Sequence, residues 1–117
     1  MGTHFTYNRH AERPVAVMWW REEDDQDLVD FSDAGYSFVF KVAPPGRNPV
    51  AVLTKSTGIV GSVGSGVEPT GTPNVVITWN VGDLDIEPGN YKWQCIATLG
   101  SDDRFAEGTI KILDAIL

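Results

Sequence analysis

The sequence predicts an all-β protein, a Greek-key sandwich of roughly seven to eight strands. Short segments alternate apolar and polar residues with a period of two, and clusters of Gly, Pro, Asn, Asp and Ser separate them. No stretch of useful length repeats its apolar residues at helical spacing. The most specific signal lies at residues 84–97, where a Pro-Gly turn and a tyrosine lead directly into an alternating strand.

That segment has the pattern of a tyrosine corner, a feature of Greek-key sandwiches. Pro88 presets φ for the first central position of a turn, and Gly89 accepts positive φ at the second. Leu84 and Ile86, which precede this turn, have apolar side chains that can pack against the core. The Tyr91 ring is then expected to enter the core, with its hydroxyl bonded to the backbone just upstream. Together these five residues are the predicted structural corner.

The strands are expected in order along the chain, each justified by its alternation or by its apolar content. They are a leading strand around Phe5 and Tyr7, then 15–20, 36–42, 50–55, a weak strand followed by a long loop within 58–71, then 74–80, 91–99 and 104–113. Residues 1–12 are expected to form an N-terminal arm or leading strand. Residues 13–117 are expected to form the sandwich.

Composition excludes several classes of protein. A length of 117 residues suits one domain, and the net charge of −7 argues against binding to nucleic acid or to an anionic membrane surface. No apolar run approaches the roughly 20 residues that span a bilayer, and the first residues lack a secretory signal pattern. The single cysteine, Cys95, excludes an internal disulfide. We therefore expect synthesis and retention in a cytosol until the protein assembles.

The charge is concentrated in residues 21–33, which carry seven carboxylates against Arg21 alone and so hold −6 of the −7. Asp24, Asp25 and Asp27 are weak candidates for Ca²⁺ ligands, because the segment lacks the third acidic position and the glycine of an EF-hand loop. The sequence favours a solvated charged loop. An electrostatic docking patch and a Ca²⁺ site remain open.

The strand at 15–20 is apolar at both parities, so it is expected either to be covered on both faces or to present one face to a partner. Only one of Trp19 and Trp20 can face inward on a regular strand. The other, with Met18 or Val17 beside it, would be an exposed aromatic patch, which favours a protein contact over a sugar platform. Met18, Trp19 and Trp20 are therefore the candidate interface.

No catalytic or cofactor motif is present. His4 and His10 lie near the N-terminus without the spacing of a Ser-His-Asp or Cys-His site. Cys95 shares the inward parity of Tyr91 and Trp93, which predicts a buried and inert thiol. We expect no enzymatic activity, no bound cofactor and no metal site beyond the weak calcium candidates.

Two segments of the chain together form a pattern known from one group of proteins. Residues 30–41 (DFSDAGYSFVFK) combine a polar loop, an Asp-apolar-Ser step, Ala-Gly and an alternating strand. The second half follows with the corner residues, an Asp-rich hairpin at 101–103 and the exit 107–112 (EGTIKI). In order and spacing these segments resemble immunoglobulin-like domains of tailed-phage virion proteins, namely the small β-sandwich of collar or tail-fibre-connector (LtfC-like) proteins and the N-terminal domain of baseplate upper proteins. The resemblance covers residues 13–113.

The resemblance implies an immunoglobulin-like sandwich and a non-enzymatic structural subunit of a tailed-phage or prophage virion. Such a subunit is a multicopy collar or connector, tail or capsid-decoration protein, made in the host bacterial cytoplasm. Its partners would be capsid, connector or tail proteins and further copies of itself. The dense acidic segment, Met18-Trp19-Trp20 in the first strand and the end of the chain after its last strand fit a connector, collar or decoration protein better than a baseplate protein. The alternative is a carbohydrate-binding or host-adhesion module.

Overall fold

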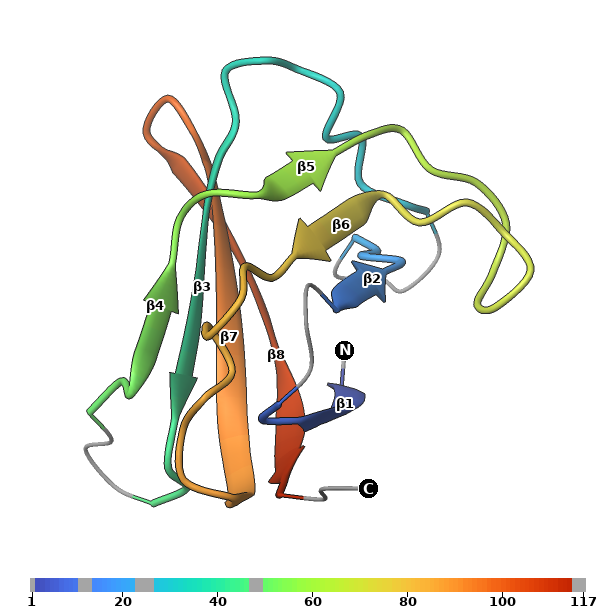
Figure 1. Ribbon diagram of the computed structural model, residues 1–117. Coiled ribbons are helices and arrows are strands. Elements are labelled where there is room, and N and C mark those ends of the chain that lie inside the picture. The colour runs from blue at the N-terminus through green and yellow to red at the C-terminus, as the bar shows by residue number, and fades with distance from the viewer. Residues whose placement is uncertain (1, 11–13, 23–26, 47–49, 115–117) are drawn as a thin grey trace.

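The computed structural model describes residues 2–10, 14–22, 27–46 and 50–114, and within them the chain is all-β, as the sequence predicts (Figure 1). The strands are β1 (Gly2–Asn8), β2 (Val15–Met18), β3 (Ser37–Ala43), β4 (Leu53–Lys55), β5 (Ile59–Gly61), β6 (Val75–Thr78), β7 (Gly89–Leu99) and β8 (Asp102–Leu113). These described residues include no helix that could cross a membrane.

The strands form two sheets. A five-stranded sheet has the order β1-β8-β7-β3-β4, and a three-stranded sheet has the order β2-β6-β5. The segment β1 pairs in parallel with β8, so the leading residues are an integral edge strand, while the other pairs are antiparallel. In Figure 1, β2, β5 and β6 lie across the long strands β3, β7 and β8 as a second layer.

The core between the two sheets is rich in aromatic rings. Phe40 of β3 stacks on Trp93 of β7 with ring centroids 5.3 Å apart, and it meets Trp79 edge-on at the same distance. Trp79 follows directly after β6, so these three rings join the two sheets. Aromatic pairs of this geometry contribute about 0.5–1.5 kcal/mol each beyond the area they bury. Because no disulfide is possible within a chain with one cysteine, burial of these side chains supplies the stability.

Strand β2 ends at Met18, two residues earlier than predicted. Beyond Met18, the backbone of Trp20 bonds the side chain of Asn74 instead of the backbone of a neighbouring strand. Asn74 is fully buried, and its amide oxygen accepts from the backbone N–H of Trp20 at 2.7 Å. Its amide nitrogen donates to the carbonyls of Trp20 at 2.7 Å and Val29 at 2.9 Å. Asn74 therefore ties the start of the acidic segment to β6.

Residues 58–71 form more structure than the predicted weak strand and loop. After β5, Ser65 and Thr72 exchange two backbone hydrogen bonds of 2.9 and 2.8 Å, so the Gly-rich segment folds back as a hairpin. At the end of β5 the backbone of Phe31 crosses so closely that a Cβ on Gly61 would lie 2.7 Å from the Phe31 carbonyl oxygen. Only glycine fits at that position.

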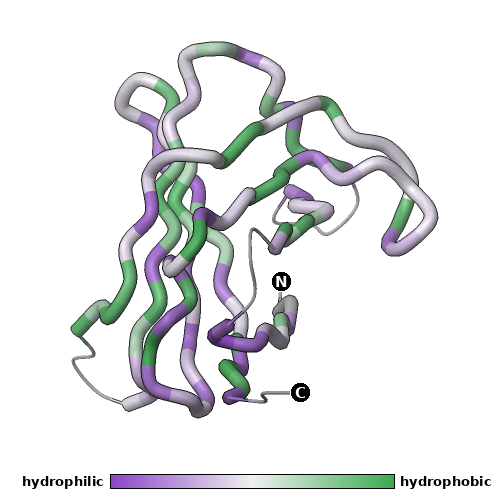
Figure 2. The backbone as a smooth tube through the Cα atoms, viewed as in Figure 1, coloured by the Kyte–Doolittle hydropathy of each residue, from purple (hydrophilic) through white to green (hydrophobic). Residues whose placement is uncertain are grey.

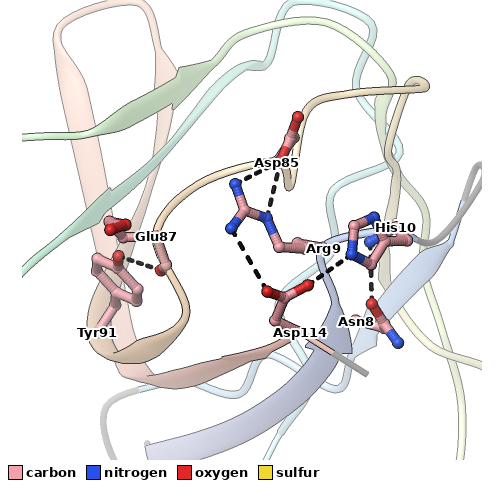
Figure 3. A network of polar contacts seen from close by, with 7 residues as sticks. All are labelled: Asn8, Arg9, His10, Asp85, Glu87, Tyr91 and Asp114. Atoms are coloured by element: carbon pink, nitrogen blue, oxygen red, sulfur yellow. Dashed lines mark hydrogen bonds and ion pairs between the residues drawn. The ribbon is translucent and has the colours of Figure 1, made fainter. Parts of the chain in front are cut away.

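The predicted corner residues lie in the loop after β6 and in the first residues of β7. Leu84 is buried, Ile86 packs against the core, and Gly89 has φ of 151° as β7 begins. The Tyr91 ring is buried and its hydroxyl donates to the Glu87 carbonyl (Figure 3). This bond closes the loop against the strand that follows it, and so orients β7, the central strand of the larger sheet.

Removal of the Tyr91 hydroxyl is expected to weaken the fold. Tyr91→Phe loses one hydrogen bond and should lower the free energy of unfolding by about 1 kcal/mol. Tyr91→Ala also leaves a cavity and should lower it by roughly 3 kcal/mol or more. Chemical denaturation of the two variants measures both effects. Equal stability of the Ala variant and the wild type would contradict a structural role for this residue.

Candidate functional site

None of the residues in β2, β5 and β6 is charged, and Figure 2 colours much of these three strands as hydrophobic. Side chains that alternate away from the core lie on the outer face of the three-stranded sheet, which we call the valine face. They are Val15, Val17, Val60, Val76 and Thr78. Val15 is 51 % exposed and Val60 64 % exposed. An exposed apolar sheet face on a small domain is a feature of interaction surfaces.

The strand register places the valines side by side. Val76 of β6 lies directly opposite Val17 of β2 on one side and Val60 of β5 on the other. The row therefore crosses the whole width of the sheet. Trp19 continues the outward parity beyond β2, is half-buried, and donates its indole N–H to the Ser65 carbonyl at 3.3 Å. The indole thus closes one end of the valine face against the hairpin.

Of the candidate interface residues Met18, Trp19 and Trp20, only Trp19 faces outward, beside Val17, which is one of the arrangements that the sequence left open. Met18 is 1 % exposed and Trp20 4 % exposed, because both take the inward parity of β2 and its continuation. Trp20 packs edge-on against Phe31 with centroids 5.0 Å apart. Only Trp19 of the three contributes to an outer face. The strand was rightly predicted to be apolar at both parities, but its outer surface consists mainly of valines.

The outer face of the five-stranded sheet carries a second apolar row. Val39, Ile96 and Phe105 lie opposite one another on β3, β7 and β8, and Phe105 is 60 % exposed. Lys41, Lys92 and Lys111 are exposed further along the same three strands. This face is therefore mixed, with an apolar row beside basic side chains. Because the core separates the two sheets, it points away from the valine face.

The acidic segment is described only in part. Asp24 and Asp25 lie outside the described residues, and Asp27 is exposed. Asp30 and Asp33 each accept a backbone N–H two residues ahead, from Ser32 at 2.9 Å and Gly35 at 2.8 Å. Hydrogen bonds from Ser32 lower the pKa of the Asp30 carboxyl. These two carboxylates therefore shape turns, which is an ordinary structural role for aspartate.

Glu22 begins the acidic segment and pairs with Arg104 of β8 at 2.6 Å, which attaches the segment to the larger sheet. The described residues contain no group of three or more His, Cys, Asp and Glu side chains that could hold a metal ion. The calcium hypothesis for Asp24, Asp25 and Asp27 stays a prediction, because two of its three carboxylates lie outside the described residues.

A polar network holds together the other end of the sandwich (Figure 3). Arg9, just after β1, contacts Asp85 of the corner loop with its Nε at 2.9 Å and its Nη2 at 2.8 Å. His10 Nε2 lies 2.6 Å from Asp114, just after β8. His4 contacts the Thr109 hydroxyl at 2.7 Å. His4 thus contacts its neighbour within β8, and His10 contacts the residue that follows β8. Exposed ion pairs such as those of Arg9 and His10 are worth about 0–1 kcal/mol.

The structure contains a buried lysine that the sequence did not predict. Lys55 is 5 % exposed, and its Nζ lies 3.0 Å from Asp83 Oδ2 and 5.7 Å from the centre of the Trp79 ring. The same Asp83 oxygen accepts the Asn80 N–H at 2.9 Å. Burial raises the pKa of Asp83, but the bonds from Asn80 and Lys55 outweigh it and lower the pKa. Asp83 therefore caps its turn and also neutralises the lysine.

Cys95 lies in the core on the inward side of β7. Burial raises the pKa of its thiol to about 12. The reactive thiolate is therefore scarce at neutral pH. This environment suits a packing residue and is the opposite of what a nucleophile needs.

Loss of Asp83 is expected to destabilise the fold more than loss of Lys55. Asp83→Asn leaves a buried ammonium without its counter-ion and should cost about 3 kcal/mol at neutral pH, whereas Lys55→Met keeps the aliphatic stem and removes the charge. Because the pKa of Asp83 is lowered by folding, its contribution is complete above the ordinary value of 3.8 and is lost as the pH falls through the folded-state value. The stability gap between wild type and Asp83→Asn should narrow in acid. A gap independent of pH would contradict this role.

Cys95 is expected to resist thiol reagents in the folded protein. At about pH 8 the thiolate fraction is small and the sulfur is buried, so labelling with a disulfide reagent should require unfolding. The absorbance of the released thiolate in native buffer and in guanidinium chloride gives the two rates. Equal rates would show that Cys95 is accessible in the fold.

Comparison with known proteins does not assign a family. No protein-family model matches this chain, and no curated protein matches it. The two apolar outer faces and the charge distribution are therefore the features from which a function can be inferred.

Proposed function

We propose that this protein is a non-enzymatic structural subunit of a tailed-phage or prophage virion, acting through protein–protein contacts. Such a subunit joins or coats other proteins in a collar or connector, a tail or a capsid decoration. The observation that carries the proposal is that both outer sheet faces have an apolar row, Val17-Val76-Val60 on one and Val39-Ile96-Phe105 on the other, and that Val60 and Phe105 are their exposed members. A protein that joins two others needs two contact surfaces on opposite sides.

We also propose that the sandwich is immunoglobulin-like. In such domains one sheet holds strands C, F and G with C′ at its edge, and the other holds B, E and D. The orders β8-β7-β3-β4 and β2-β6-β5 agree with that arrangement. Tyr91 stands two residues before Trp93, where antibody domains carry a cysteine. Trp93 and Phe40 then occupy the region that a disulfide holds in antibody domains, which supports a disulfide-free variant.

The partners under this proposal are other virion proteins and further copies of the chain, after synthesis in the host bacterial cytoplasm. A net charge of −7 disfavours nucleic acid as a ligand. Many copies in one particle would let individually modest contacts hold, because each bound subunit raises the effective concentration of the next. Small apolar rows suffice for that kind of assembly.

The alternative, a carbohydrate-binding or host-adhesion module, requires exposed indole rings on which sugars stack. Trp20, Trp79 and Trp93 are buried in the core, and Trp19 is half-buried against the hairpin. The described residues therefore contain no pair of exposed tryptophans on which a sugar could stack. Protein contact is the better supported function.

Co-purification with particles tests the proposed function. The protein is expressed from its native locus, together with the neighbouring genes. It should then sediment with intact particles through a density gradient and stay attached to them after nuclease treatment. Phe105→Lys places a charge in the apolar row of the larger sheet and should reduce the bound amount at least tenfold if that face binds another virion protein. Thr54→Lys, exposed on the edge strand β4, is a matched control for added charge. Recovery of the wild type only in the particle-free fraction would overturn the proposal.

A further inference from the structure

We infer that the outer face of the five-stranded sheet binds an acidic segment of a partner protein through Lys41, Lys92 and Lys111. The strand register places these three residues, which we call the lysine row, diagonally across β3, β7 and β8. Lys92 lies two residues from Gln94, the partner of Lys41. Lys111 lies two residues from Thr109, the partner of Lys92. Diagonal neighbours in a sheet are about 7–8 Å apart, so the row spans a distance that one protein segment can cover.

The lysine row is positive although the chain is acidic. The chain contains four lysines and has a net charge of −7. Lys55 is buried, so every exposed lysine belongs to the row. Among the strand residues of this face within the span of the row, Glu107 alone is acidic. At contact distance the sign of the local charge decides which partner surface is complementary, and here it selects carboxylates.

The lysine row has no counter-ion among the described residues. Three other basic side chains are paired with carboxylates, and these pairs are Arg9–Asp85, Lys55–Asp83 and Arg104–Glu22. Lys41, Lys92 and Lys111 form no such pair within the described part of the chain. Like charges on neighbouring strands repel one another. Carboxylates of a partner would remove this repulsion, so binding has a favourable contribution that folding alone does not supply.

The side chains around the row favour a protein segment over a sulfated polysaccharide or a nucleic acid. Val39, Ile96 and Phe105 cross the same face beside the row, and Phe105 is 60 % exposed. A protein segment supplies carboxylates together with apolar side chains, and the apolar side chains can cover this ring. Sulfate and phosphate groups are best matched by the planar fork of arginine. Arg104, the one arginine in these five strands, takes the inward parity of β8 and pairs with Glu22.

The inference deepens the proposed function and rests on it, because it names the chemistry of one partner of the subunit. It also predicts a salt dependence. Between about 0.1 M and about 1 M salt the Debye length falls from about 10 Å to about 3 Å, which weakens contacts between opposite charges. A contact through Val39, Ile96 and Phe105 alone would not weaken in this way. Salt should therefore reduce binding of the wild type more than binding of a variant that lacks one lysine.

Binding of the purified full chain to an immobilised random copolymer of glutamate and tyrosine tests the inference. This probe supplies carboxylates beside apolar rings, and heparin serves as the polysaccharide probe. Lys92→Met keeps the aliphatic stem, should fold normally by circular dichroism and should weaken binding at least threefold, whereas Lys92→Glu should weaken it at least tenfold. Val60→Glu, at a site 64 % exposed on the other sheet, changes the net charge by the same amount as Lys92→Met. It is the matched control and should bind as the wild type does.

The outcomes distinguish failure of the inference from failure of the proposed function. Equal binding by Lys92→Met and Val60→Glu, tighter binding to heparin than to the copolymer, or no binding to either probe overturns the inference. A wild type found in particles, with Lys92→Glu recovered there in equal amount, also removes the inference and leaves the virion proposal standing. Lysine-dependent binding to the copolymer by a chain that is absent from particles removes the virion proposal and supports an acidic partner outside the virion.

Discussion

The structure depends on the packing of Trp79 between its two sheets. The ring is fully buried directly after β6, meets Phe40 of β3 at 5.3 Å and lies edge-on to Tyr7 of β1 at 6.3 Å. It therefore contacts both the middle and the edge of the larger sheet. With a single cysteine in the chain, no covalent bond joins the sheets. A large aromatic side chain buries enough surface to serve instead, at about 25 cal/mol per Å² of apolar area.

The placement of Trp79 also explains the buried ion pair and the corner. Lys55 lies over its ring, Asp83 neutralises Lys55, and the turn that carries Asp83 leads into the loop closed by Tyr91. The edge strand β4, through Lys55, and the loop that leads into β7, through Asp83, are thus both held close to the Trp79 ring. A buried charge is tolerated here because an opposite charge, a backbone N–H and an aromatic face all contact the pair.

The all-β class and the corner could be predicted because their signals are local. Phe38, Phe40 and Val42 alternate within one strand, and Tyr91 lies three residues after Pro88. The roles of Asn74 and Lys55 could not, because their partners lie far away in sequence: Asn74 bonds Trp20, and Lys55 bonds Asp83. The residues next to Asn74 and Lys55 in the sequence do not indicate which distant residue each one contacts. For the same reason the sequence identified an apolar strand at 15–20 but could not decide which of Trp19 and Trp20 faces the core.

The outer faces are where this fold departs from what stability alone requires. Exposed apolar rows on a sheet invite unwanted association, and proteins commonly place charges there to prevent it. This chain carries sixteen acidic residues, yet β2, β5 and β6 hold none of them. The net charge of −7 is carried mainly by residues 21–33, outside these three strands. A sheet face kept free of charge in an acidic chain is therefore not explained by folding alone.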